Sequence, residues 1–364
     1  MSKIAVNAED EKKQLSSQYL KNSAQSEHEE TPNKTEDNKS VSVLFKENPS
    51  KYTILPIEHK DIWKMYEKHN GVIWQVSHVK LDDDKSDWEK LNENEKHYLK
   101  NVLGFFAASD GIVCENIVER FSSEVQLTEA RFFYGVQTYM ENIHSHMYSL
   151  LIDTYISDPV EKNRIINAIQ TMPVINKKAM WAKKWIESDK PFHVRLVAFA
   201  LVEGFFFSGA FCSIFWVRQK HGKKYLDGLI KANEYISRDE NLHFMFACLL
   251  YNKYCKERMT EDEFQEIMME AYNIETEFIL DSLRCSLLGM NSDLMSEYIR
   301  HVANIVAINL EHEEPFPGAH QPFPFMDQIG MADNQDFFQG RPTDYQKPIL
   351  NECEKIEYDS EEEF

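Results

Sequence analysis

Apolar residues recur every three or four positions over most of the chain, which is the spacing of amphipathic α-helices. Asn92 and Thr128 stand where helix caps are expected, and Thr260 forms a capping-box pattern with Glu263. The pattern predicts helices from Asn92 to about Glu124, from Thr128 to about Tyr155, from Leu196 to about Arg218, around Glu240, from Thr260 to about Leu288 and from Leu294 to about Leu310. No convincing period-two run is present, so the sequence predicts one all-α domain.

One of these helices is apolar on every side. The 22 residues from Leu196 to Val217 carry a single charge, that of Glu203. This length would suit a membrane span, but a carboxylate at the bilayer centre costs roughly 3 kcal/mol. No other segment of the sequence could serve as a partner span. We therefore predict no membrane association and a helix buried in a large helical protein, where Glu203 has a function.

Both ends of the chain differ in composition from the middle. Residues 1–42 are rich in Lys, Glu, Ser and Asn, and we predict a disordered arm there, followed by a helical domain over 43–310. Several prolines after Leu310 exclude a long helix, so 311–364 should be a flexible C-terminal segment. Its last part, residues 352–364, holds seven acids against one lysine and ends in Phe364. Such a tail is usually solvated, but one with an aromatic end can also dock on a partner.

The overall charge limits the possible partners. The 364 residues are 43% hydrophobic and 12% aromatic, enough for a large core, and the net charge is −20. This surplus of acid argues against nucleic-acid binding, which requires a basic surface. Six cysteines without a Cys-x-x-Cys pair indicate reduced thiols, and with no signal-peptide pattern at the amino terminus we predict a cytoplasmic protein.

Candidate metal chemistry lies in two copies of a short motif, Glu141-x-x-His144 and Glu240-x-x-His243. Residues three apart share one face of a helix, so each pair can reach one point in space. A single copy would be weak evidence, because short motifs recur by chance. Tyr148 follows His144 by one turn on the same face, where a redox-active metal could oxidise its phenol.

Each motif also has an acid in an apolar stretch about 30 to 40 residues upstream, namely Asp110 and Glu203. A carboxylate from each of two helices with Glu-x-x-His from each of two others is the signature of ferritin-like dinuclear carboxylate proteins. The sequence therefore predicts a ferritin-like helical bundle whose six ligands hold two metal ions in the core. Such carboxylate-rich sites accept manganese as well as iron.

Longer motifs carry a family resemblance. The stretches are Phe105-Phe-Ala-Ala-Ser-Asp-Gly-Ile, Glu129-Ala-Arg-Phe-Phe-Tyr-Gly, Met140-Glu-Asn-Ile-His-Ser, Val202-Glu-Gly-Phe-Phe-Phe-Ser-Gly and Ile236-Ser-Arg-Asp-Glu-Asn-Leu-His. With them, the chain from about residue 43 to about 346 resembles the small subunit of class I ribonucleotide reductase, of the eukaryotic or viral type.

The resemblance implies an oxo-bridged di-iron centre that reacts with O2 and leaves a stable radical on a tyrosine. It implies that the metal ligands are Asp110, Glu141, His144, Glu203, Glu240 and His243. Tyr148 would be the radical site, and Phe207, Phe211 and Ile236 would shield it. A dry pocket suits a radical, because water and reductants would quench it.

The resemblance also implies a homodimer that works only with a separate large subunit, bound through the C-terminal tail, as ribonucleoside-diphosphate reductase. The oxidising equivalent would pass through His144, Asp239, Trp74 and Tyr345 to that subunit, which makes deoxyribonucleotides for DNA synthesis.

The sequence departs from the family pattern at several positions. His146 stands where the family usually has Glu, and at two residues from His144 it should point away from the metals. The stretch Glu311 to His320 is divergent, and Ser360 replaces the leucine that is usual in the tail, which suggests a matched large subunit. The alternatives are a di-iron monooxygenase or oxidase on the same fold and, from another class, an iron-storage or inactive interaction protein. Neither alternative requires a shielded Tyr148.

Overall fold

The computed structural model describes residues 42–49, 52–283 and 290–329 of the chain. No β-strand occurs in these ranges, so the predicted all-α class is confirmed. The first elements are η2 (Val43–Phe45), α2 (Lys60–Asn70), η3 (Val76–His78), α3 (Asp84–Lys90), α4 (Glu93–Asn116), η4 (Ile117–Phe121), α5 (Ser122–Glu124), α6 (Thr128–Tyr155), α7 (Pro159–Ile166) and α8 (Ala168–Thr171). The others are α9 (Pro173–Ile186), α10 (Phe192–Leu201), η5 (Val202–Phe206), α11 (Ser208–His221), α12 (Asp227–Leu249), η6 (Leu250–Tyr254), α13 (Glu261–Ser282), α14 (Ser292–Asn309) and α15 (Pro324–Ile329).

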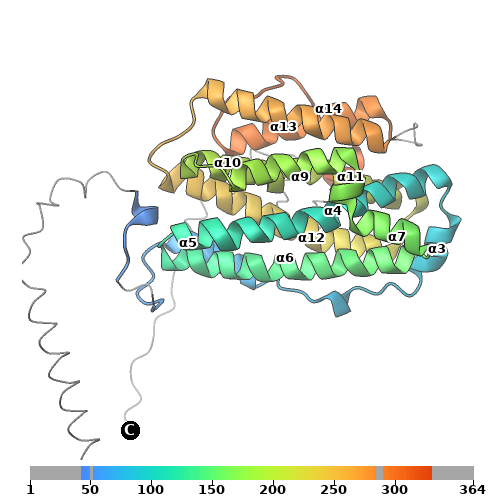
Figure 1. Ribbon diagram of the computed structural model, residues 1–364, viewed down its shortest axis with the longest axis horizontal. Coiled ribbons are helices and arrows are strands. Elements are labelled where there is room, and N and C mark those ends of the chain that lie inside the picture. Colours follow the sequence, from blue (N-terminus) through green and yellow to red (C-terminus); the bar gives the residue numbers. More distant parts are fainter. Residues whose placement is uncertain (1–41, 50–51, 284–289, 330–364) are drawn as a thin grey trace, which may run out of the picture. The chain divides into compact units, whose positions relative to one another are not determined.

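Four long helical segments form the centre of the bundle: α4, α6, the run α10–η5–α11, and α12. Figure 1 shows α4 and α6 side by side along most of their length, and their residues are in contact. α12 contacts α6, α10 and α11, while α13 and α14 pack on each other and against α9 and α11. Functional side chains on the four central segments can therefore meet inside the protein.

The apolar run α10–η5–α11 is the one described helix long and apolar enough to cross a membrane, with a mean hydropathy of 1.8 over its best window. That window is completely buried inside the protein, which agrees with the predicted core helix. The turn η5 in its middle is π-helical, a local widening that often occurs at functional sites. Gly204 lies in this turn, and a Cβ atom there would come within 2.4 Å of the Phe244 ring. Glycine therefore lets the turn approach α12 closely.

Two of the three predicted helix N-caps are present in the structure. The Asn92 side chain accepts hydrogen bonds from the backbone N–H groups of Asn94 and Glu95, and Thr260 forms the predicted capping box with Glu263. The prediction that Thr128 caps the next helix is wrong. Thr128 is the first residue of α6, and its hydroxyl accepts a hydrogen bond from the Asn48 side chain at 3.2 Å instead. A distant segment thus competes with the local cap.

The helix predicted to end near Leu288 ends at Ser282, because Leu283 leaves the helical conformation, with φ −93° and ψ 66°. The predicted disordered arm, most of the predicted C-terminal segment with Tyr345, and the acidic tail lie outside the described residues. The predicted domain limits therefore stay predictions.

Candidate metal centre

The six predicted ligands come from the four central segments. Asp110 lies on α4, and Glu141 and His144 lie on α6. Glu203 lies in the π-helical turn η5, whereas α12 carries Glu240 and His243. All six side chains are buried, with relative exposures of 1% or less. Helical spacing thus directs each Glu-x-x-His pair inward, as the sequence predicts, and tertiary packing brings the pairs face to face.

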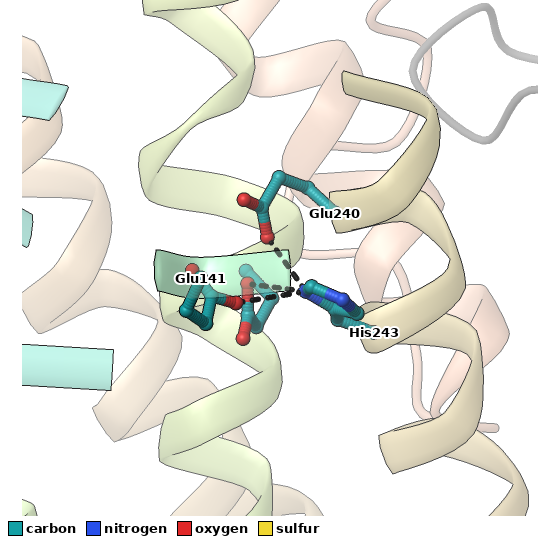
Figure 2. Close-up of side chains that lie close together, drawn as sticks. Glu141, Glu240 and His243 are labelled. Atoms are coloured by element: carbon teal, nitrogen blue, oxygen red, sulfur yellow. Dashed lines mark hydrogen bonds and ion pairs between the residues drawn. The ribbon is translucent and has the colours of Figure 1, made fainter. Parts of the chain in front are cut away.

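Four of these residues form one tight cluster. Ligand atoms of Glu141, Glu203, Glu240 and His243 all lie within 4.8 Å of one another. Nδ1 of His243 is 3.0 Å from Oε1 of Glu141, 3.0 Å from Oε2 of Glu240 and 3.8 Å from Oε2 of Glu203. Figure 2 shows the Glu141 and Glu240 carboxylates converging on the His243 ring. Such a group of oxygen and nitrogen donors could bind a metal ion.

His144 lies beside this cluster and contacts two of its carboxylates. Its Nδ1 is 3.0 Å from Oε1 of Glu240 and 3.6 Å from Oε2 of Glu141. The two carboxylates therefore each direct one oxygen to His144 and the other to His243. Glu141 and Glu240 would therefore help to hold both ions of a dinuclear centre.

Several nitrogen and oxygen atoms of the six predicted ligands have no hydrogen-bond partner. These atoms show whether the residues fit a metal centre. Both carboxylate oxygens of Asp110 and of Glu141, Oε2 of Glu203, Oε1 of Glu240 and Nδ1 of His144 are buried without a hydrogen-bond partner. Buried polar atoms are rarely left unpaired in proteins. Cations between these side chains would satisfy them, so the residues present fit a metal centre.

The pKa values of the buried ligands also fit a metal centre. Burial, followed by repulsion from Glu141, raises the pKa of Asp110 well above its usual value, and burial with repulsion from Glu240 does the same to the pKa of Glu203. Burial alone would lower the pKa of His144, but the hydrogen bond to Asp239 and the neighbouring carboxylates of Glu141 and Glu240 raise it well above the ordinary value. Without cations the carboxylates of Asp110 and Glu203 can be tolerated only by taking up protons. Divalent ions would remove that penalty.

Tyr148 lies one helical turn beyond His144 in an aromatic pocket. Its ring stacks on Phe106, with centroids 4.6 Å apart and planes 5° from parallel. Phe106 in turn contacts Phe211 at 4.8 Å and Phe207 at 5.7 Å, and Ile236 is also buried. The Tyr148 hydroxyl is buried without a hydrogen-bond partner. Burial, then the charges of Asp110 and its neighbours, raises the pKa of Tyr148 well above its usual value, so the phenol keeps its proton.

A hydrogen-bonded path leads away from the cluster through Asp239. Oδ2 of Asp239 lies 3.2 Å from Nε2 of His144 and accepts a hydrogen bond from Nε1 of Trp74 at 2.7 Å. The rings of Trp74 and His144 are stacked, with centroids 6.1 Å apart. Arg238 donates to the other oxygen of Asp239 at 3.0 Å. Three of the predicted relay residues are therefore linked in space by hydrogen bonds. The fourth, Tyr345, lies outside the described residues.

Three residues near the centre were missed by the sequence analysis. Nε2 of His69 lies 2.9 Å from Nε2 of His243, and Gln137 donates to Oε1 of Glu203 at 3.1 Å. Phe106 forms the stacking surface for Tyr148. Gln137 stands four residues before Glu141, so helical spacing could have indicated it. His69 had no such signal, because it lies on α2. His146, by contrast, is exposed, as its spacing predicts.

The centre also has an approach from outside. Asp110 and Glu141 line a pocket of about 330 Å³ between α4 and α6. Cys114, Glu119 and Ser145 contribute to the same wall. Two of the predicted ligands therefore lie at the wall of this pocket, although each is only 1% exposed.

Comparison with known proteins agrees with this geometry. The family described as "Ribonucleotide reductase, small chain" matches residues 51–324. The ribonucleoside-diphosphate reductase small chain of Trypanosoma brucei brucei is 50% identical over 312 residues, covering 86% of this chain and 91% of the relative. Human ribonucleoside-diphosphate reductase subunit M2 is 48% identical over 305 residues, covering 84% and 77%.

Solved structures support the same fold. The ribonucleotide reductase Rnr4 homodimer of Saccharomyces cerevisiae has a TM-score of 0.70 and 32% identity, covering 80% of this chain and 92% of the yeast chain. The R2 subunit of Clostridium botulinum, at 19% identity and a TM-score of 0.67, shares the fold. These relatives carry reductase names, not those of a monooxygenase or a storage protein. The chain therefore belongs to the small-chain family of the ribonucleotide reductases, which are oxidoreductases.

Proposed function

We propose that this chain generates and stores a tyrosyl radical at Tyr148 next to a dinuclear metal centre. The centre would hold two ions per chain, iron in the first place, with manganese also suited to the carboxylate ligands. When bound, the ions would supply one-electron oxidising chemistry beside Tyr148, whose phenol would give up one electron and one proton. Asp110, Glu141, His144, Glu203, Glu240 and His243 would bind the ions.

The observation that carries this proposal is the position of the Tyr148 phenol, which lies one turn from His144 and stacks on Phe106. Its hydroxyl is buried and has no hydrogen-bond partner. An unpaired buried hydroxyl costs free energy, about 1–3 kcal/mol, so packing alone would favour phenylalanine at this position. A radical site explains the cost, since a phenol is needed for oxidation and a dry aromatic pocket protects the product.

The stored equivalent would then serve a separate large subunit. His144, Asp239 and Trp74 form the internal part of the proposed relay, and Tyr345 would connect it to the partner. There the oxidising equivalent would start the reduction of ribonucleotides to deoxyribonucleotides for DNA synthesis. The acidic tail, residues 352–364, would hold the two subunits together.

We further propose that the chain is a cytoplasmic homodimer. The yeast relative of known structure is a homodimer, and its similarity extends over most of this chain. Four cysteines in the described residues, Cys114, Cys212, Cys248 and Cys255, are free thiols, which suits a reducing compartment. Sedimentation of the protein at micromolar concentration should give a dimer, and a monomer alone would contradict this assembly.

The proposal is tested by loading metal-free protein with Fe²⁺ without oxygen and then adding O2. We expect a sharp tyrosyl absorption band and the paramagnetic signal of a phenoxyl radical. Tyr148→Phe should bind the same amount of iron and give neither signal. Tyr134→Phe is the matched control, because Tyr134 lies on the same helix with a buried, unpartnered hydroxyl. A radical signal that persists in Tyr148→Phe would refute the assignment.

A further inference from the structure

The two histidines of the candidate metal centre differ in what their outer nitrogens meet. His144 directs Nδ1 to the carboxylate cluster and Nε2 to Asp239 at 3.2 Å. His243 also directs Nδ1 to the cluster, but its Nε2 meets Nε2 of His69 at 2.9 Å. One histidine is thus backed by a carboxylate and the other by an imidazole.

His69 is well fixed in this position. It lies near the end of α2 and is fully buried, with its ring 4.9 Å from the His243 ring and 5.3 Å from the Phe133 ring. A histidine that binds a metal through Nδ1 keeps its proton on Nε2. His243 would therefore donate this proton, and a neutral His69 would accept it at Nε2.

The partner of the outer nitrogen changes how strongly an imidazole binds a metal. A carboxylate acceptor draws the N–H proton toward itself and makes the imidazole more basic, whereas a neutral acceptor does this less. Asp239 shares its charge with Trp74 and Arg238, which reduces the difference without removing it. The two ligand histidines should therefore be unequal donors although their carboxylate neighbours are shared.

We propose that His69 is a positioning residue that fixes the ring and proton of His243, and that its neutral character makes the metal position at His243 the weaker of the two. This inference rests on the proposed dinuclear centre. It assigns to α2, which supplies none of the predicted ligands, control over the order in which the two positions fill.

The test is a titration of the metal-free, full-length protein with Mn²⁺, in which the paramagnetic signal of the free ion gives the bound fraction. The unchanged protein should show a tighter and a weaker position. His69→Leu removes the acceptor and should weaken only the second position, by about 10- to 100-fold, as is usual when a hydrogen-bond partner of a metal ligand is lost. His69→Gln, which offers a neutral carbonyl acceptor, should restore most of that loss.

A complementary variant separates this role from a general effect on folding. Asp239→Asn should weaken the position at His144 and bring the two affinities closer together, whereas His69→Leu should move them apart. Thermal unfolding of each metal-free variant identifies loss of fold, and if His69→Leu does not fold, His69→Asn, whose side chain is too short to reach His243, replaces it.

The possible failures are distinguishable. An unchanged protein that binds no Mn²⁺ or Fe²⁺ would contradict the proposed function itself. Two bound ions of equal affinity, or a weaker position unaffected by loss of the acceptor, would overturn only the role of His69. An equal loss at both positions would also overturn it, because the acceptor would then act on the whole cluster.

Discussion

The indole of Trp74 donates a hydrogen bond to the carboxylate of Asp239, with 2.7 Å between Nε1 and Oδ2. The same oxygen lies 3.2 Å from Nε2 of His144. One buried carboxylate atom therefore joins a tryptophan on the loop after α2 to a predicted metal ligand on α6. Hydrogen-bonded chains of this kind polarise one another, so a change of charge at one end is felt at the other.

Replacement of Trp74 by phenylalanine should interrupt this path without disturbing the metal centre. The variant keeps an aromatic ring but loses the N–H donor to Asp239. We expect unchanged metal content and an unchanged tyrosyl signal. Nucleotide reduction with the large subunit should fall by at least about 100-fold, the lower end of what a positioned proton-transfer group contributes. Trp88→Phe is the control, because Trp88 is a buried tryptophan stacked on Tyr155 at 4.7 Å. Equal activity in the two variants would rule out this path.

Glu203→Gln should separate metal binding from stability. The amide keeps the shape of the side chain but removes the charge, so metal binding should fall from two ions to one or none per chain. Burial and repulsion from Glu240 raise the pKa of Glu203, so its charge is a burden on the metal-free fold. The melting temperature of the metal-free variant should therefore equal or exceed that of the unchanged protein.

A matched substitution at Glu129 should have the opposite effects on the melting temperature and on metal content. Glu129 is also buried on α6, but its carboxylate accepts hydrogen bonds from the backbone N–H groups of Glu58 and His59 at 2.8 and 3.0 Å. Glu129→Gln should lower the melting temperature and leave both ions bound. Full metal content in Glu203→Gln, measured by elemental analysis, would remove Glu203 from the ligand set.

A buried ion pair supports the turn that carries Glu203. Nζ of Lys178 lies 2.6 Å from Glu275 and donates to the backbone carbonyl of Phe206 at 2.8 Å, at the end of η5. Lys178→Met should cost about 3–5 kcal/mol of unfolding free energy, because it leaves the Glu275 charge buried and unpaired. The double variant Lys178→Met with Glu275→Leu should recover much of that loss in urea unfolding. A single variant within about 0.5 kcal/mol of the unchanged protein would contradict this role, since that is the range of surface substitutions.

The sequence anticipated those parts of the site that follow helical spacing. The i, i+3 pairs Glu141–His144 and Glu240–His243 face inward because both lie on regular helix. The wide turn at Glu203 could not be predicted, since apolar periodicity does not distinguish a π-helical turn inside an apolar run. His69 contacts His243 across 174 residues of sequence, and only the packing of α2 on α12 brings them together. The wrong prediction of a helix cap at Thr128 has the same cause, a hydrogen-bond partner from a distant segment.

Acidification should weaken the fold through Glu95 at the start of α4. Burial raises the pKa of this carboxyl, but hydrogen bonds from Lys220, Asn92 and His221 outweigh it and hold the pKa below its usual value. Between the folded and the unfolded pKa of Glu95, the unfolded chain therefore binds more protons than the folded protein. The stabilisation is present above the unfolded pKa of about 4.3, and it is lost as the pH falls through the lower folded pKa.

Comparison with Glu95→Gln measures this contribution. At neutral pH the variant should be about 1.5–3 kcal/mol less stable, the range for hydrogen bonds to a charged group. The difference should shrink as urea unfolding is repeated at lower pH. Glu93→Gln is the control, because the Glu93 side chain is 89% exposed in the same first turn. A difference from Glu95→Gln that is independent of pH would show that shape, not charge, stabilises this helix start.

The last prediction concerns the acidic end of the chain. Residues 352–364 contain seven acids, with Ile356, Tyr358 and Phe364 as the apolar side chains. A segment of this composition can order on a partner and tether it through a few apolar anchors. Tyr345 stands just upstream, so docking of the tail would bring it to the boundary between the subunits.

Truncation after Gln346 should therefore leave the metal content and the Tyr148 signal intact while abolishing turnover with the large subunit. A synthetic peptide of residues 352–364 should compete with the intact chain for that subunit, because it carries the same anchors. Its binding should weaken as salt rises, since salt screens the attraction of the acids for a basic site. A scrambled peptide of equal charge is the control, as it separates the order of Ile356, Tyr358 and Phe364 from net charge. Full activity of the truncated chain would show that the subunits associate through another surface.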